Sequence, residues 1–218
     1  MGADIHAERM RRFASAGLYV VITESFCAGR PPLSVLSDCL DAGVRLVQFR
    51  EKGLTGLELF TRAEAFRQRT RDAGALLIVN DRIDIALAVE ADGVHLGQDD
   101  LPLAVARRIA PGLVLGSSSH NLDEALAAQE YGASYVNIGP IFDTQTKDVP
   151  TGALGPEALS IIAPRLHVPF TCMGGIKEHN VDEVLARGAR TIAVVTAVTA
   201  AKDPGEAAAR LLARIRAA

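Results

Sequence analysis

The chain has 218 residues, 49% of them hydrophobic, and a formal net charge of −3 at pH 7. This content supports one substantial core, and the small negative charge gives no overall attraction to nucleic acid or anionic membranes. No apolar run approaches the ~20 residues of a membrane span, and the charged opening MGADIHAERM lacks the apolar core of a signal peptide. We therefore expect a cytoplasmic protein that acts on small molecules, with no nucleic-acid or membrane partner. Its three widely spaced cysteines predict free thiols and no zinc site.

Short β-rich runs alternate with longer amphipathic or alanine-rich runs along the whole chain, which is typical of parallel strands joined by helices. The expected strands are Leu18–Thr23, Val44–Arg50, Leu76–Asn80, Gly93–Leu96, Leu113–Ser118, Tyr135–Gly139, Pro169–Met173 and Thr191–Val195. The expected helices are Pro32–Asp41, Gly56–Ala73, Asp84–Glu90, Leu103–Ala110, Leu122–Tyr131, Pro156–Ala163, Val181–Arg187 and Pro204–Arg216.

Eight consecutive strand–helix units predict an α/β fold, a single (β/α)8 TIM barrel. A doubly wound open sheet is the alternative, but no GxGxxG motif follows the first strand. Residues Ile5–Phe13 predict an extra N-terminal helix that closes the bottom of the barrel. We expect one domain over 1–218, with this helix in 1–16 and the barrel in 17–218.

A glycine follows the last turn of several expected helices. The tripeptides Asp41-Ala42-Gly43, Tyr131-Gly132-Ala133 and Arg187-Gly188-Ala189 share this feature. Glycine enters the left-handed conformation without steric cost, so each position predicts a left-handed C-cap before the next strand.

The second expected strand carries polar side chains at alternate positions near its end. The strand period places Gln48, Arg50 and Lys52 on one face and Phe49 on the other. If the apolar face meets the helices, the polar stripe enters the barrel mouth, where such barrels hold their active sites. Two cations there predict an anionic ligand. Solvated charges on an exposed strand face are the alternative.

Two carboxylates, Asp81 and Asp100, each follow the end of an expected strand. Magnesium is usually held by one or two carboxylates together with substrate phosphates, so the pair predicts a Mg²⁺ site. Helix capping is the alternative, by Asn80 or Asp81 at one helix and by Asp99 or Asp100 at the next.

Two further segments suit phosphate groups. The loop Thr144-Gln145-Thr146-Lys147 offers two hydroxyls and an ammonium group to a phosphate or a departing diphosphate. Gly174-Gly175 and the end of the eighth strand occupy the usual phosphate pocket of these barrels.

Two histidines, His95 and His120, are expected near the mouth as hydrogen-bonded structural groups. No local spacing places an acid beside His120, so no Ser-His-Asp or Cys-His relay is predicted.

Several blocks of the sequence, in their order, resemble the thiamine phosphate synthase (thiamine-phosphate pyrophosphorylase) family. They are QFREK (48–52), VNDRIDIALAVEADGVHLGQDDLP (79–102), GSSSHNLDEA (116–125), GASYVNIGPIFDTQTK (132–147), GGI (174–176) and IAVVTAV (192–198). The resemblance implies a Mg²⁺-assisted transferase that joins hydroxymethylpyrimidine diphosphate to a (carboxy)hydroxyethylthiazole phosphate, releasing diphosphate and giving thiamine monophosphate. A homodimer is left open.

The resemblance also implies residue roles. Catalytic roles fall to Arg50, Lys52 and Lys147, and metal binding falls to Asp81 and Asp100. The substrate-binding set is Gln48, Phe49, Arg50, Glu51, Lys52, Asn80, Ser118, Thr144, Gln145, Thr146, Lys147, Gly175, Val195 and Thr196.

Two other functions stay open. The first is a thiazole tautomerase of the same fold, in which a histidine at the place of His120 acts as acid and base. The presence of Arg50, Lys52, Asp81, Asp100 and Lys147 favours the synthase over it. The second is a binder of phosphate ligands without turnover.

Overall fold

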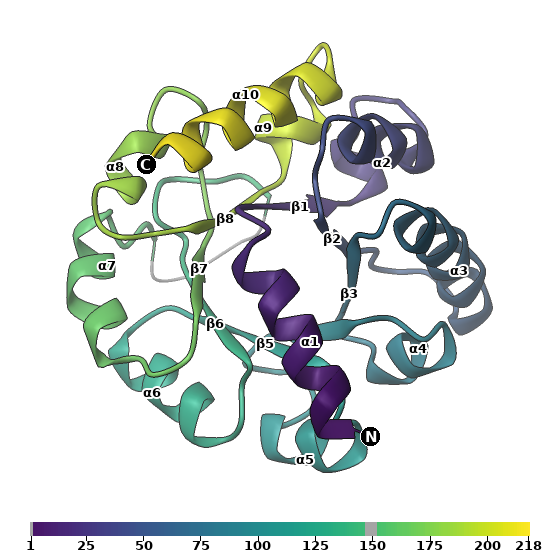
Figure 1. Cartoon of the computed structure of the whole chain (residues 1–218), viewed down its shortest axis with the longest axis horizontal. Helices are drawn as coiled ribbons and strands as arrows, with labels where there is room; N and C mark the ends of the chain where they lie inside the picture. The colour runs from purple at the N-terminus through teal and green to yellow at the C-terminus, as the bar shows by residue number, and fades with distance from the viewer. Residues whose placement is uncertain (1, 147–151) are drawn as a thin grey trace.

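Figure 1 shows the computed structural model of the chain, which describes residues 2–146 and 152–218. Within these ranges, eight parallel strands form a closed barrel in sequence order, and β8 pairs with β1. The strands are β1 (Leu18–Ile22), β2 (Leu46–Phe49), β3 (Leu76–Asn80), β4 (Gly93–Leu96), β5 (Val114–Ser119), β6 (Tyr135–Ile138), β7 (Phe170–Cys172) and β8 (Thr191–Val194).

Most of the helices surround this barrel (Figure 1). They are α1 (Gly2–Ala14), α2 (Pro32–Asp41), α3 (Gly56–Asp72), α4 (Ile83–Ala88), α5 (Leu103–Ile109), α6 (Leu122–Glu130), α7 (Glu157–Ile162), α8 (Val181–Leu185), α9 (Thr196–Thr199) and α10 (Pro204–Ala217), with 3-10 turns η1 (Glu24–Phe26) and η2 (Ala163–Arg165). The expected barrel with an N-terminal helix is confirmed, and the open-sheet alternative is excluded by the β1–β8 pairing. No helix among the described residues combines the length and apolar character needed to cross a membrane.

Most element ends fall within two residues of the prediction, and the differences have local causes. The second strand was predicted from Val44 but begins at Leu46. The backbone N–H of Val44 instead donates to Cys39 O at the end of α2, so this residue belongs to the helix cap. Helix α9 was missed because its threonines and valine are β-branched and favour strands by local propensity.

The predicted left-handed glycine caps are confirmed. Gly43, Gly132 and Gly188 have φ angles of +94°, +91° and +84°. Each glycine reverses the chain directly after a helix, so the next strand can run in the same direction as its neighbours.

Strand alternation produces two apolar layers. Outward-facing residues such as Val20 and Val47 pack with the helices in the main core. Inward-facing residues such as Leu46, Ile78 and Val114 form a smaller cluster inside the barrel. Helix α1 crosses the end of the barrel that faces the viewer in Figure 1.

Helix α1 closes this end with both apolar and polar contacts. Phe13 is fully buried and stacks on Tyr135, with ring centroids 4.5 Å apart. On the same helix, Arg9 Nη1 donates to Gly112 O at 2.8 Å, and His6 Nε2 shares a 2.9 Å hydrogen bond with Ser134 Oγ. The expected closure of the barrel bottom is confirmed.

This arrangement generates a stability prediction. Phe13→Ala should lower the free energy of unfolding by about 3–5 kcal/mol, because it removes a buried aromatic ring and leaves a cavity. The matched control is Ile5→Ala on the same helix, where the side chain is 47% exposed, with an expected loss of less than about 1 kcal/mol. Urea unfolding of both variants measures the difference, and equal losses would show that α1 is not a plug.

Candidate functional site

The carboxyl ends of the strands surround two adjoining cavities. The larger has a volume of about 540 Å³ and lies against the ends of β7 and β8. The smaller has a volume of about 180 Å³ and lies against the ends of β2 to β5. Thr146, Met173 and Val195 line both, so the two cavities form one continuous candidate site.

The polar stripe of β2 enters the smaller cavity as its period predicts. Gln48, Arg50 and Lys52 line this cavity, and Gln48 is only 2% exposed. The alternative of a solvated strand face is therefore wrong for Gln48, although the Lys52 side chain is 63% exposed at the rim.

Two neighbouring residues in the expected substrate-binding set do not line either cavity. The ring of Phe49 faces outward and packs on Phe66, with centroids 4.9 Å apart. The carboxylate of Glu51 accepts a 2.7 Å hydrogen bond from the backbone N–H of Glu24, and burial raises its pKa above the usual range. Alternation along β2 explains the outward position of the Phe49 ring, because the outward face belongs to the helix layer.

Asp81 and Asp100 meet at the smaller cavity. Burial, and after it the Asp100 carboxylate, raises the pKa of Asp81, while Lys52 acts in the opposite direction with Nζ 3.5 Å from Asp81 Oδ2. The Asp100 carboxylate also accepts a 2.6 Å hydrogen bond from the backbone N–H of Gly97. This cluster attracts a cation, because two neighbouring, partly buried carboxylates repel each other when both are ionised.

The capping alternative for the two aspartates is not seen. The N-caps of α4 and α5 are Arg82 and Pro102, and neither helix start has a side-chain capping bond. Both carboxylates are thus directed to the cavity rather than to a helix end.

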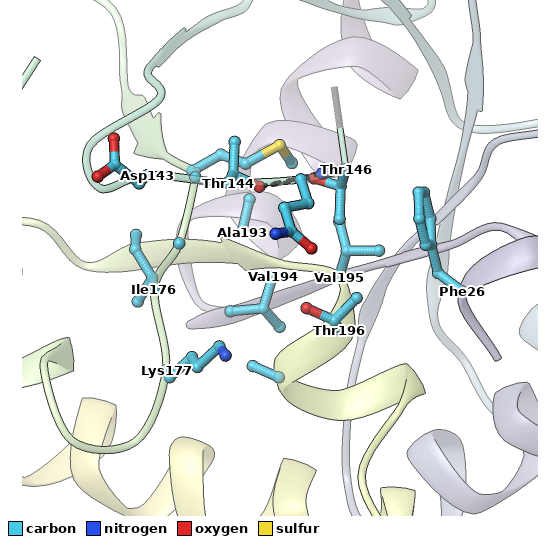
Figure 2. Close-up of a pocket in the computed structure, with 15 residues that line it drawn as sticks. Phe26, Asp143, Thr144, Thr146, Ile176, Lys177, Ala193, Val194, Val195 and Thr196 are labelled. Carbon is cyan, nitrogen blue, oxygen red and sulfur yellow. Dashed lines mark hydrogen bonds between the residues drawn. The ribbon is translucent and has the colours of Figure 1, made fainter. Parts of the chain in front are cut away.

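The larger cavity gathers hydroxyls, glycines and a lysine (Figure 2). Thr144 and Thr146 share a 2.9 Å hydrogen bond between their hydroxyls. Thr196 begins α9 on the opposite wall. Hydroxyls, backbone N–H groups and an ammonium group suit the oxygens of a phosphate.

Gly175 is required at this wall for two reasons. Its φ angle is +62°, which side chains disfavour, and a Cβ atom there would lie 2.5 Å from Asp143 O. The glycine therefore lets the β6–α7 and β7–α8 connections pack tightly while its backbone stays at the cavity surface.

Sequence reasoning missed some residues of the site. Lys177 and Phe26 both line the larger cavity. Lys177 stands two residues after Gly175, and a cation so close to a glycine pair was the signal that could have found it. Phe26 carries no such signal, because it arrives on the short turn η1 after β1. The predicted Lys147 lies outside the described residues.

His120 has an acidic partner, which corrects the prediction that none lies near it. Glu124 Oε2 lies 2.8 Å from His120 Nδ1, and the same carboxylate accepts from the backbone N–H of His120. Asn121 is the N-cap of α6, so Glu124 in its first turn reaches back over the strand–helix junction. The Asn-x-x-Glu spacing was the overlooked signal.

The closed barrel, with its candidate site at the carboxyl ends of the strands, defines the chain as an α/β-barrel protein of the kind that serves as an enzyme scaffold. The chain belongs to the thiamine monophosphate synthase family, whose model matches residues 18–198.

Named relatives are similar in sequence to this chain over most of their own lengths. The thiamine-phosphate synthase of Chlorobium luteolum is 48% identical over 84% of this chain and 86% of its own. That of Moorella thermoacetica is 46% identical over 89% of this chain and 93% of its own. Among solved structures, a thiamine phosphate pyrophosphorylase from Pyrococcus furiosus superposes with a TM-score of 0.87 and 36% identity, covering 95% of this chain and 98% of that one.

The glycine wall can be tested with two alanine variants. Gly175→Ala should weaken binding of a phosphate ligand at least tenfold, which corresponds to about 1.4 kcal/mol of binding free energy. The reason is that the Cβ atom of the new alanine forces the wall to move. Gly188→Ala is the matched control, since its φ is also positive but its Cβ would meet nothing within 4 Å. Calorimetric titration with the thiazole phosphate measures both, and unchanged affinity in Gly175→Ala would remove this wall from the phosphate site.

Proposed function

We propose that the chain condenses hydroxymethylpyrimidine diphosphate with a (carboxy)hydroxyethylthiazole phosphate to give thiamine monophosphate and diphosphate. One observation carries the proposal. A smaller cavity, where Arg50 and Lys52 meet three aspartates, opens into a larger cavity with phosphate-binding character. Two phosphorylated substrates that must react with each other need such adjoining sites.

The smaller cavity supports the diphosphate end of the first substrate. Arg50 and Lys52 supply positive charge there, and Gln48, Asn80 and Ser118 supply hydrogen-bonding groups. We include Lys147 in the proposed site because the family resemblance gives it a role in binding the diphosphate.

The donor set of the smaller cavity fits a magnesium ion. Asp81 and Asp100 are hard oxygen ligands, and their mutual repulsion favours a cation between them. No cluster of three or more His, Cys, Asp or Glu residues suited to a metal occurs in the described part of the chain. A pair of carboxylates is nevertheless a usual magnesium set, because water and substrate phosphates complete the coordination. When bound, the ion neutralises charge on the diphosphate oxygens.

The larger cavity supports the thiazole phosphate. Thr144, Thr146 and Thr196 offer hydroxyls to its phosphate, and Gly175 and Val195 offer backbone groups, with Gln145 beside them. Lys177 adds an ammonium group that the family resemblance did not supply.

Charge development explains why these residues suit the reaction. The bond between the pyrimidine methylene carbon and the diphosphate oxygen breaks, and its electron pair leaves with the diphosphate. The thiazole nitrogen then gives its lone pair to the methylene carbon. Arg50 and Lys52 bind the diphosphate more strongly as its charge grows, so they lower the barrier. The reaction needs no nucleophile from the protein.

Three points remain predictions that rest on the sequence alone. They are the cytoplasmic location, the single domain and the open question of a homodimer.

The metal site generates the next prediction. Condensation should stop in EDTA and return with Mg²⁺, and Asp100→Ala should reduce turnover by about 10²-fold or more. The matched control is Asp203→Ala, because Asp203 caps α10 by accepting from the backbone N–H of Glu206 at 2.9 Å. Its loss should cost about 1 kcal/mol of stability and leave turnover intact. Full turnover in EDTA would remove the metal from the proposal.

A second experiment separates the synthase from a tautomerase. Lys147→Ala should impair condensation strongly, because an ammonium group that meets the departing diphosphate acts mainly in the transition state. A tautomerase would instead lose about 10²- to 10⁴-fold on His120→Ala, since the His120–Glu124 pair would be its acid and base. Both variants are assayed for both reactions after circular dichroism confirms folding. Intact condensation in Lys147→Ala with none in His120→Ala would overturn the assignment.

A further inference from the structure

A row of five hydrogen-bonded side chains crosses the barrel interior below the smaller cavity. Gln48 Nε2 donates to Tyr19 Oη at 2.6 Å, and Tyr19 Oη lies 3.0 Å from Tyr135 Oη. Tyr135 Oη lies 2.9 Å from His95 Nδ1, and His95 Nε2 lies 3.0 Å from Ser118 Oγ. We call these five residues the interior network. They come from five different strands, and both of its ends, Gln48 and Ser118, line the smaller cavity.

The proton positions along this row follow from its first bond. The amide of Gln48 donates to Tyr19, so the hydroxyl proton of Tyr19 goes to Tyr135, its other hydrogen-bond partner. Tyr135 then donates to His95 Nδ1. Burial raises the pKa of both tyrosines, so both hydroxyls stay protonated.

The histidine transmits this direction to the cavity. Because His95 Nδ1 accepts the hydrogen bond of Tyr135 in this direction, Nε2 is left as the ring's donor and gives its hydrogen bond to Ser118 Oγ. Ser118 is thereby left with its hydroxyl proton for a ligand, while Gln48 keeps its carbonyl oxygen as an acceptor. If every hydrogen bond of the row were reversed, the two ends would exchange roles and would still offer one donor and one acceptor.

We propose that Tyr19, Tyr135 and His95 are positioning residues that present Ser118 as a donor and Gln48 as an acceptor to an uncharged nitrogen heterocycle. Such a ligand carries both an N–H group and a ring nitrogen with a free lone pair. A phosphate offers only acceptors, so it suits the cationic side chains of the same cavity and not this mixed pair. The inference rests on the proposed function, in which the pyrimidine ring is that heterocycle.

The surroundings show that the row is built in and not accidental. Polar side chains inside a barrel cost desolvation, and the neighbouring inward residues are apolar. The Tyr135 ring has a prepared space, because a Cβ atom at Gly116 would overlap it directly. Phe13 stacks on one side of that ring, and His95 stacks on it with centroids 5.7 Å apart.

The test removes one oxygen atom from the middle of the row. Tyr135→Phe keeps the ring and its packing but breaks both hydrogen bonds of the hydroxyl. We expect kcat/KM for the pyrimidine diphosphate to fall about tenfold, with KM for the thiazole phosphate unchanged. The matched control is Tyr131→Phe, the same change on a tyrosine that is 56% exposed and lies outside the network. Equal effects on both substrates, or none, would overturn the proposal.

A double variant shows whether Tyr135 acts through Ser118. If it does, adding Tyr135→Phe to Ser118→Ala causes little further loss, because the receiving hydroxyl is already gone. Additive losses would contradict the transmission. Tyr19→Phe is the second variant in case Tyr135→Phe does not fold, and it should also raise KM for the pyrimidine diphosphate selectively. If Tyr19→Phe folds but changes neither kcat/KM nor KM for the pyrimidine diphosphate, the network is contradicted.

The histidine gives an independent readout. Nitrogen-15 NMR of the whole protein should show His95 as a neutral ring protonated on Nε2, and Tyr135→Phe should lose this fixed form. A His95 protonated on Nδ1 in the unaltered protein would contradict the assigned direction.

Failure of the proposed function has a different signature. In that case the unaltered protein catalyses no condensation, yet calorimetry still detects hydroxymethylpyrimidine diphosphate binding that Tyr135→Phe weakens. Absence of that binding would overturn the inference as well.

Discussion

The pairing of β8 with β1 is the constraint on which the rest of the structure depends. Parallel strands that close into a ring have all their carboxyl ends at one rim, so loops far apart in sequence must share one mouth. Asp81 follows β3 and Thr196 follows β8, yet both reach adjoining cavities for this reason. Closure also creates an interior, which α1 must cover from below with Phe13.

Charge is distributed unevenly around that mouth. Burial, and after it the Asp100 carboxylate, keeps the pKa of Asp81 raised although Lys52 lies beside it. The smaller cavity, which contains both acidic and cationic side chains, therefore suits a cation and a polyanion together. The larger cavity offers hydroxyls and Lys177 instead, which suits a single phosphate. The two parts of this continuous site therefore suit anions of different size.

Local patterns predicted much of the site because the strand period is so simple. Alternation alone assigned Gln48 to the interior and Phe49 to the exterior, and the structure agrees for both side chains. The family resemblance, by contrast, placed Phe49 among substrate-binding residues, although its ring packs on Phe66 in the outer layer. The His120–Glu124 pair was missed for a different reason, because the contact joins a strand end to the first turn of α6.

The sequence by itself determined the order of the strands and helices, the glycine caps and the face on which each strand side chain lies. These properties depend on residues at most a few positions apart. Only the tertiary structure decided that Tyr19 meets Tyr135, a partner 116 residues away, and that Lys177 reaches the larger cavity. Barrel closure brings these distant residues together. No local period encodes such contacts, because they depend on how all eight strands pair at once.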